Sequence, residues 1–309
     1  MRIIRYTRDT ELNIEEKTVV ALGFFDGVHA GHRILIRSAV NAARELGLTP
    51  AVFTFSPGDN IKSDSPRIYP EDEKMKILES LGVKIVISAD FGSIKDMPRE
   101  EFVDSFLIKS AGCQIAVAGM DFRFGSRALG DTAFLEGRMM SHGLAAIIVR
   151  MKEYEDDDGR LREISSTRIR DLLHLGRVKE AAILLGEPYH IGGKVLHGRK
   201  VGRQLGYPTV NICLPNNSPL ASGVYETRVK IGEKLYTGLT NVGTCPSFEE
   251  RERHTETFIL DFEGDLYGDR IEIDFLDYVR GERAFSTPTD LIEEIARNIK
   301  QVREKENGR

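Results

Sequence analysis

The first half of the chain alternates between short apolar runs and segments in which apolar residues recur every three or four positions. The apolar runs have the length of strands and the periodic segments have the length of helices. Strands are expected from residue 18 and at 49–55, 84–88, 114–118 and 145–149, and helices at 34–46, 71–81 and 98–109. This alternation predicts a doubly wound α/β domain with a parallel sheet, whose ligands bind beyond the carboxyl ends of the strands.

Beyond residue 188 the pattern changes to short apolar runs that have no helical segments between them. The runs lie at 189–196, 223–231, 235–242, 255–262 and 270–276, and a last helical segment spans 288 to about 304. Runs of strands separated by turns are typical of a small antiparallel β-barrel, here with a terminal helix. The break at 186–188 therefore predicts a boundary between a domain of residues 1–186 and one of residues 187–309.

Composition limits the class of protein. A chain of 309 residues with 41% hydrophobic content can bury a sizeable core and fits two domains. Its net charge of −5, with both signs interspersed, offers no wide basic field for nucleic acid or an anionic membrane. The three cysteines form no CxxC pair, and no apolar stretch has the length of a signal segment or membrane span. We therefore expect a soluble cytoplasmic protein, and the sequence leaves open whether it is a homo-oligomer.

The first candidate site is the stretch 18–33, which reads TVVALGFFDGVHAGHR. A strand-length run breaks at Gly23, and His29 and His32 follow where an amphipathic helix begins. The first amides of a helix lack partners within it and carry the positive end of its dipole, so they bind anions. With two imidazoles beside them, they predict a triphosphate pocket. The alternative is a turn with only a structural role.

The string GFFDGVHAGH resembles the HxGH nucleotidylyltransferase superfamily, in the version carried by bacterial bifunctional riboflavin kinase/FAD synthetases. The resemblance implies an FMN adenylyltransferase domain in which His29 and His32 are catalytic. It also implies that Gly23, Phe24 and Phe25 bind the nucleotide.

Two later segments extend this resemblance. Residues 119–130 match the GxDFxFG segment of the family, which adds Asp121 to the nucleotide site. Their arginines and phenylalanines suit a stacked heterocycle beside phosphates, unless the phenylalanines only pack on the sheet. Residues 164–170 read ISSTRIR, and hydroxyls at such a place cap helices. Three hydroxyls followed by two arginines exceed that need, and the resemblance implies that Ser166, Thr167 and Arg170 hold the β and γ phosphates.

The second candidate site begins with GGKVLHGRKVGRQLGYPTVNI, residues 192–212. This string is not a P-loop, because it lacks both GK[ST] and a following helix. It resembles the flavokinase barrel, which implies that a glycine-rich loop covers the ATP phosphates and that a PTxN segment holds Mg²⁺. The implied loop residues are Gly193, Gly198, Gly202 and Arg203, and the implied metal ligands are Thr209 and Asn211. Hydroxyl and amide oxygens suit this hard cation, although the two side chains could instead satisfy a bend.

Phosphoryl transfer to a hydroxyl favours a carboxylate beside the acceptor, and Glu256 is the residue that matches the family. The resemblance also implies that Arg280 lies near this site. The family motif ETH is here Glu256, Thr257 and Phe258, and His254 stands nearby. A second departure follows the strand at 49–55, where FSPGDN replaces the FxPHP of the family.

These features predict a two-step enzyme that phosphorylates riboflavin to FMN with ATP and Mg²⁺ and then adenylylates FMN to FAD. Flavin is then both substrate and product. Two alternatives remain open at this point. One is an adenylyltransferase for another phosphorylated acceptor, such as a pantetheine or nicotinate derivative. The other is a flavin-binding regulator that has lost one or both activities.

Overall fold

The computed structural model describes residues 1–56, 66–150, 152–156, 159–197, 202, 205–215, 217–244 and 253–307. The chain forms two compact units. One comprises Met1–Ser65 and Pro70–Ser166, and the other comprises Pro66–Tyr69 and Thr167–Arg309. Helices α6 (Ser166–His174) and α7 (Val178–Leu185) therefore belong almost wholly to the second unit. The domain boundary at 186 remains a prediction.

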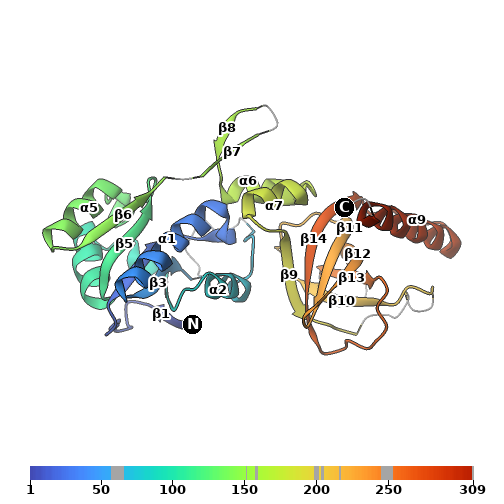
Figure 1. Cartoon of the computed structure of the whole chain (residues 1–309), viewed down its shortest axis with the longest axis horizontal. Helices are drawn as coiled ribbons and strands as arrows, with labels where there is room; N and C mark the ends of the chain where they lie inside the picture. The colour runs from blue at the N-terminus through green and yellow to red at the C-terminus, as the bar shows by residue number, and fades with distance from the viewer. Residues whose placement is uncertain are drawn as a thin grey trace. The chain divides into compact units, whose positions relative to one another are not determined.

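The first unit contains the predicted parallel sheet, which has six strands (Figure 1). Its strands are β1 (Arg2–Tyr6), β2 (Thr18–Leu22), β3 (Thr49–Phe55), β4 (Ile85–Ala89), β5 (Cys113–Gly119) and β6 (Ala145–Val149). They lie in the order β1-β4-β3-β2-β5-β6 and every pair is parallel. The chain moves outward from β2 in one direction and then returns to β5 on its other side. Ligands of such sheets bind where the direction of winding changes, at the carboxyl ends of β2 and β5.

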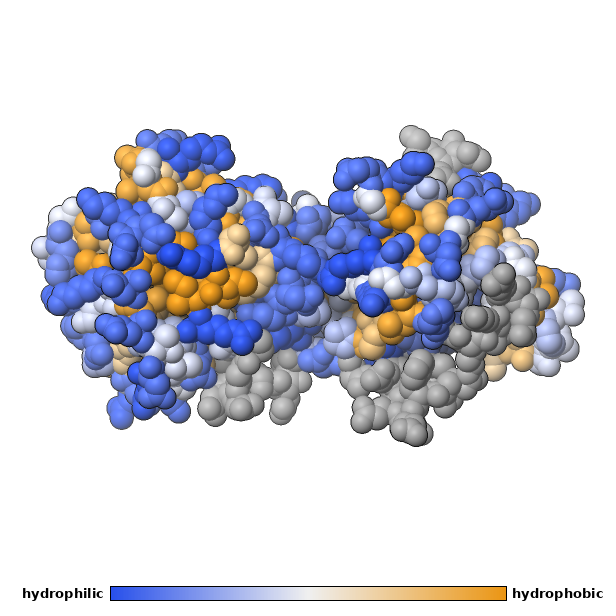
Figure 2. Space-filling model, turned by 90° about the horizontal axis from the view of Figure 1, so that it is seen from below, coloured by the Kyte–Doolittle hydropathy of each residue, from blue (hydrophilic) through white to orange (hydrophobic). Residues whose placement is uncertain are grey.

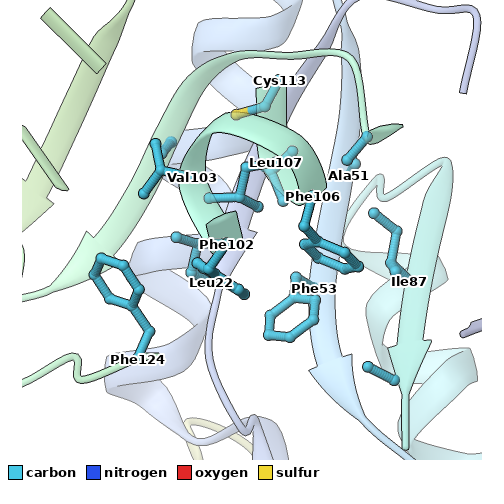
Figure 3. Close-up of a cluster of buried hydrophobic side chains, with 14 of the residues drawn as sticks. Leu22, Ala51, Phe53, Ile87, Phe102, Val103, Phe106, Leu107, Cys113 and Phe124 are labelled. Carbon is cyan, nitrogen blue, oxygen red and sulfur yellow. The ribbon is translucent and has the colours of Figure 1, made fainter. Parts of the chain in front are cut away.

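Helices accompany these strands, and the longer ones bury one face each. They are α1 (Ala30–Leu46), α2 (Glu71–Ser80), α3 (Phe91–Ile94), α4 (Arg99–Glu101) and α5 (Thr132–Ser141). The helix expected at 98–109 forms as α4 followed by a π-helix, η2 (Phe102–Ser110). Phe102 and Phe106 of η2 pack on Phe53 of β3 in a hydrophobic cluster of this unit (Figure 3). A short antiparallel pair forms from β7 (Glu153–Glu155) and β8 (Leu161–Glu163).

The second unit contains the predicted antiparallel barrel. Its strands are β9 (Tyr189–Lys194), β10 (Thr209–Leu214), β11 (Gly223–Ile231), β12 (Lys234–Thr244), β13 (Arg253–Ile259) and β14 (Arg270–Arg280). They lie in the order β10-β13-β12-β11-β14-β9, and a bridge between Leu196 and Asn211 nearly closes the barrel. On one face of the sheet the hydroxyls of Thr227, Thr240 and Thr257 form a buried chain of hydrogen bonds. The terminal helix α9 (Pro288–Asn307) packs on β11 and β12 through Val302.

On the face seen in the space-filling view, hydrophilic residues predominate and hydrophobic residues form separate groups among them (Figure 2). Within the described part of the chain, no helix combines the length and the apolar character needed to cross a bilayer.

Candidate active sites

The turn after β2 has an unusual backbone. Phe25 has φ 54° and ψ 34°, and Val28 has φ 39°, so two residues with side chains adopt left-handed conformations around Gly27. Such conformations cost about 1–3 kcal/mol each and cluster at functional sites. The Phe25 ring is fully buried, and a Cβ atom on Gly23 would lie 2.8 Å from its Cζ. Gly23 therefore has a packing role that follows from the position of Phe25.

His29 and His32 lie together at the start of α1. His29 is the N-cap residue, and its Nδ1 accepts a hydrogen bond from the backbone N–H of His32 at 3.3 Å. The two rings stack with their centroids 3.5 Å apart, and the edge of Phe25 contacts His32. An Nδ1 that accepts leaves the proton of a neutral His29 on Nε2. His29 can thus donate a hydrogen bond at the amino end of the helix.

Burial controls the charge of both rings. It lowers the pKa of His29 to about 4. Burial also lowers the pKa of His32 well below its usual value, and the charges of His29 and Lys74 lower it further. Both imidazoles are therefore neutral at pH 7. The Nδ1 atom of His32 is buried and has no hydrogen-bond partner among the described residues, so a polar atom in this turn is left for a ligand.

The segment of residues 164–170 reaches this turn through Ser166, whose hydroxyl donates to the carbonyl oxygen of Asp26 at 2.9 Å. Thr167 and Arg170 belong to the second unit, where Arg170 donates to the Thr167 hydroxyl at 3.1 Å. Asp121 is exposed just beyond the carboxyl end of β5. The structure thus joins Ser166 to the turn by a direct contact.

Phe122 and Phe124 differ from the expectation of a ring pair available for stacking. Phe124 is buried and contacts Phe102 with ring centroids 5.0 Å apart, and Phe122 stacks on Phe124 at the border of the core. The alternative, that the phenylalanines of residues 119–130 pack on the sheet, is correct for Phe124. Arg123 pairs with Asp131 at 3.6 Å.

The second site lies on the barrel face that α9 covers. A row of polar residues crosses three strands, because Asn211 of β10 is opposite Glu256 of β13, and Glu256 is opposite Asn241 of β12. Two positions along, Thr209, Phe258 and Leu239 form a parallel row on the same face. Pairing between strands that are distant in the sequence therefore brings Thr209, Asn211 and Glu256 together on one face of the sheet.

Two cavities meet at Thr209. The first has a volume of about 340 Å³ and is lined by Glu256, Asn241 and Arg280 among apolar residues that include Phe258, Leu239 and Ile295. The second has a volume of about 480 Å³ and is lined by Asn211 together with Asp265 and Tyr267. Thr209 lines both. Volumes of this order suit small organic ligands.

The charged groups around the first cavity are partly held in place. Nε2 of His254 lies 3.3 Å from a carboxylate oxygen of Glu256. Nε of Arg280 donates to Asn298 of α9 at 3.0 Å and lies 3.4 Å from the buried carboxylate of Glu294. Phe258, where the family motif has histidine, forms part of the apolar wall and meets Tyr207 edge to face.

Comparison with known families covers nearly the whole chain. The FAD synthetase family matches residues 11–168, and the riboflavin kinase family matches residues 185–305. The bifunctional riboflavin kinase/FMN adenylyltransferase of Bacillus subtilis (strain 168) is 34% identical over 98% of this chain and 97% of its own. The chain belongs to this bifunctional family.

Other family members and structures agree with the extent of the match. The Escherichia coli (strain K12) enzyme of the same name is 32% identical, with 98% of this chain and 97% of that one covered. A solved structure described as a macrolide-efflux protein from Streptococcus pneumoniae is 32% identical, with a TM-score of 0.83 over 98% of this chain and 99% of that chain. The predicted fold and family are thus confirmed along the full length.

The glycine-rich loop expected of a family kinase is described only in part. Gly193 lies in β9, where a Cβ atom would come 2.2 Å from Cγ2 of Ile212. A Cβ atom on Gly202 would come 2.3 Å from the carbonyl oxygen of Tyr207. Both glycines thus permit close packing. Gly198, Arg203 and most of FSPGDN lie outside the described residues.

Sequence reasoning about this bifunctional family member overlooked two residues that the fold places in the sites. Lys74 donates to the Phe24 carbonyl oxygen in the first site, and Asn241 faces Glu256 in the second. Asn241 carries a weak signal, because a polar amide stands in a run that otherwise reads as a strand. Lys74 carries none, since lysine is common on helix surfaces.

Proposed function

We propose that the second unit phosphorylates riboflavin with MgATP to FMN, and that the first unit transfers an adenylyl group from ATP to FMN, which gives FAD and pyrophosphate. The observation that carries this proposal is that the FAD synthetase and riboflavin kinase families match separate parts of one chain, and each part holds a candidate site of different chemistry. One site offers backbone amides and neutral imidazoles, and the other offers carboxylate, hydroxyl and amide oxygens. Riboflavin, FMN and ATP are the proposed partners, and the cytoplasm is the proposed location.

In the kinase step, the largely apolar cavity of about 340 Å³ is the place for the flavin ring, and the more polar one of about 480 Å³ is the place for ATP. Thr209 lies where the 5′-hydroxyl of riboflavin and the γ-phosphate would meet. Glu256 accepts a hydrogen bond from that hydroxyl, orients its oxygen toward the γ-phosphorus and takes its proton late in the transfer. Arg280, held by Glu294 and Asn298, adds positive charge at the border of the cavity.

The donor set of this site fits Mg²⁺. Thr209 and Asn211 stand two residues apart on one face of β10 and offer a hydroxyl and an amide oxygen beside the carboxylate of Glu256. These are hard oxygen ligands, which magnesium prefers over nitrogen or sulfur. When bound with ATP, the ion neutralises charge on the phosphates. We assign its binding to Thr209 and Asn211, and we assign nucleotide contact to the loop residues that follow β9, Gly198, Gly202 and Arg203.

In the adenylyl step, a phosphate oxygen of FMN attacks the α-phosphorus of ATP. The bond between the α-phosphorus and the oxygen that bridges to the β-phosphate breaks, and pyrophosphate leaves. His29, His32 and the first amides of α1 donate hydrogen bonds to the charge that develops on the phosphate oxygens. Ser166 is fixed against the same turn, and Thr167 and Arg170 are the proposed holders of the outer phosphates. Gly23, Phe24, Phe25 and Asp121 complete the proposed nucleotide contacts.

The proposed function and its two alternatives, an adenylyltransferase for another acceptor and a flavin-binding regulator, predict different outcomes in one assay. The test is incubation of the full chain with riboflavin and MgATP, followed by chromatographic separation of riboflavin, FMN and FAD. Our proposal predicts that FMN accumulates first and FAD follows. FMN without FAD would favour adenylyl transfer to another acceptor, and a yellow purified protein without turnover would favour a flavin-binding regulator.

A further inference from the structure

Lys74 lies next to the turn between β2 and α1, which is the proposed phosphate site of the first unit. It belongs to α2, and only 4% of its surface is exposed. Lysine is almost never this deeply buried unless its charge is compensated, because an ammonium group loses its hydration. By contrast, Lys76 on the same helix has 45% of its side chain exposed and pairs with Glu73. The burial of Lys74 therefore indicates a specific local role, because a lysine that only keeps a helix surface hydrated would be exposed.

Two oxygen atoms hold the ammonium group of Lys74. Its Nζ atom donates to the carbonyl oxygen of Phe24 at 2.9 Å and to Oγ1 of Thr54 at 2.7 Å. The Thr54 hydroxyl donates to the same carbonyl at 2.8 Å. This carbonyl belongs to the peptide that leads into Phe25, the residue with φ 54°. Two donors from β3 and α2 thus fix the peptide at which the turn enters its left-handed conformation.

The fixed peptide determines where the histidines lie. Phe25 contacts His32 with ring centroids 5.2 Å apart, and His32 stacks on His29. A rotation of the peptide before Phe25 would move that ring and, with it, the surface on which His32 packs. Interiors transmit such shifts because they are closely packed.

We propose that Lys74 is a positioning residue of the adenylyl-transfer site, which fixes the peptide between Phe24 and Phe25 and thereby sets where His29 and His32 meet the phosphates of ATP. This inference rests on the adenylyl-transfer function proposed above. Lys74 acts through the turn, and the phosphate contacts themselves are made by the histidines and the helix amides.

The positive charge of Lys74 also supports its role in the adenylyl-transfer site. The titratable groups that lower the pKa of His32, in addition to burial, are His29 and Lys74. A fixed cation on this side keeps His32 neutral, so that the ring can form a hydrogen bond to phosphate without exchanging a proton. The cation also adds to the positive potential at the amino end of α1, which favours an anionic ligand.

The test compares Lys74→Met with Lys76→Met, which removes the same charge from an exposed position on the same helix. In Lys74→Met we expect kcat for FAD formation from FMN to fall about 10²-fold, the size of effect that a small misplacement of catalytic groups produces. The KM for ATP should change less than about threefold, because ground-state binding is spread over many contacts. FMN formation from riboflavin by the same sample serves as the internal control, and Lys76→Met should leave both activities unchanged.

A nuclear magnetic resonance titration gives a second readout that does not need turnover. The His32 ring should titrate at higher pH in Lys74→Met than in the wild-type protein, because a neighbouring cation has been removed. If Lys74→Met does not fold, Thr54→Val, which is nearly isosteric and removes the other donor to Phe24, takes its place with an expected loss of about 10-fold in kcat.

The outcomes separate this inference from the function on which it rests. A wild-type protein that forms no FAD would refute the proposed function, and the His32 titration would still test the placement of Lys74. A folded Lys74→Met with kcat within about threefold of wild type would overturn the inference. An unchanged His32 titration, or a Thr54→Val substitute with wild-type kcat, would overturn it as well.

Discussion

The two candidate sites are built by different means. In the first unit, His29 is only 2% exposed, and the turn around it depends on left-handed backbone, a helix terminus and rings whose charge burial has removed. In the second unit, the Glu256 side chain is 48% exposed and stands in a row of polar side chains on a sheet face. The first site depends on a particular backbone conformation and on the burial of its rings, which only the packed fold provides. The second site depends only on the strand register that places its side chains opposite one another.

This difference has a consequence for mutation. Removal of a buried imidazole changes packing, charge balance and catalysis together, because one set of contacts serves all three. Replacement of Glu256 should change little in the barrel, since its side chain is 48% exposed and its polar interaction is with the neighbouring His254. Activity and stability should therefore be coupled in the first site and separable in the second.

The largest effect is expected for His32→Ala. FAD formation from FMN should fall by about 10²- to 10³-fold, because a donor to the developing phosphate charge is lost. FMN formation from riboflavin should persist, and both rates can be followed by chromatography. His142→Ala, an exposed histidine of the same unit, is the matched control. Equal loss of both activities in folded His32→Ala would contradict the assignment of two sites.

A smaller effect, confined to one of the two activities, is expected for Glu256→Gln. Glutamine keeps the shape but cannot take the proton, so riboflavin turnover should fall by at least about 10²-fold. Riboflavin binding and the FMN to FAD step should be nearly unchanged, and Glu233→Gln in the turn between β11 and β12 is the control. Kinase turnover within a few-fold of wild type would move the search to Glu282, which lines the same cavity.

A pH dependence of stability should be specific to the first site. The pKa of His29 is near its usual value of 6.5 in the unfolded chain, whereas burial lowers it to about 4 in the folded chain. As the pH falls between these values, the unfolded state binds more protons and stability is lost. His29 alone should lower the free energy of unfolding by about 2 kcal/mol between pH 7 and pH 5.

Urea unfolding followed by circular dichroism at several pH values measures this loss. His29→Asn keeps an N-cap residue without an imidazole, so its stability should depend less on pH over the same interval. A wild-type protein and His29→Asn with the same pH dependence would show that His29 is not buried in its neutral form.

The smallest effect is expected for Gly193→Ala in the barrel. A Cβ atom 2.2 Å from Ile212 forces β9 and β10 apart, and such overpacking typically costs about 1–3 kcal/mol. The urea midpoint should fall while the KM for ATP of the folded protein changes little. Gly137→Ala, in α5 with open space around it, is the control. A large rise in KM without loss of stability would make Gly193 a nucleotide contact rather than a packing residue.

The predictable part of this protein is local in sequence. The HxGH turn, with His29 and His32 three residues apart, requires only a strand, a turn and a helix start, and each leaves its own pattern. Thr209 and Asn211 could be named because the string around them resembles the PTxN segment of the family, which is also a local feature of the sequence. Strand β1 was not predicted, because its charged and apolar residues are mixed and its edge position leaves it mostly exposed.

Other features depend on partners far away in the chain. Phe124 reads as a free aromatic ring until η2 brings Phe102 against it. The sequence string suggests a loop glycine at Gly193, but in the barrel the Ile212 side chain lies where a Cβ atom of residue 193 would be. Lys74 and Asn241 carry no motif, and they become part of the sites only when α2 packs under the turn and β12 pairs with β13.

The sequence by itself determined the two fold classes, the family and the residue types of both sites, since periodicity and short motifs encode these directly. The tertiary structure alone decided which side chains are buried, which imidazoles are neutral and which polar groups face one another. The physical reason is that burial, charge and cross-strand pairing arise from contacts between distant residues. Local patterns predict the parts of each site, whereas packing fixes their chemistry.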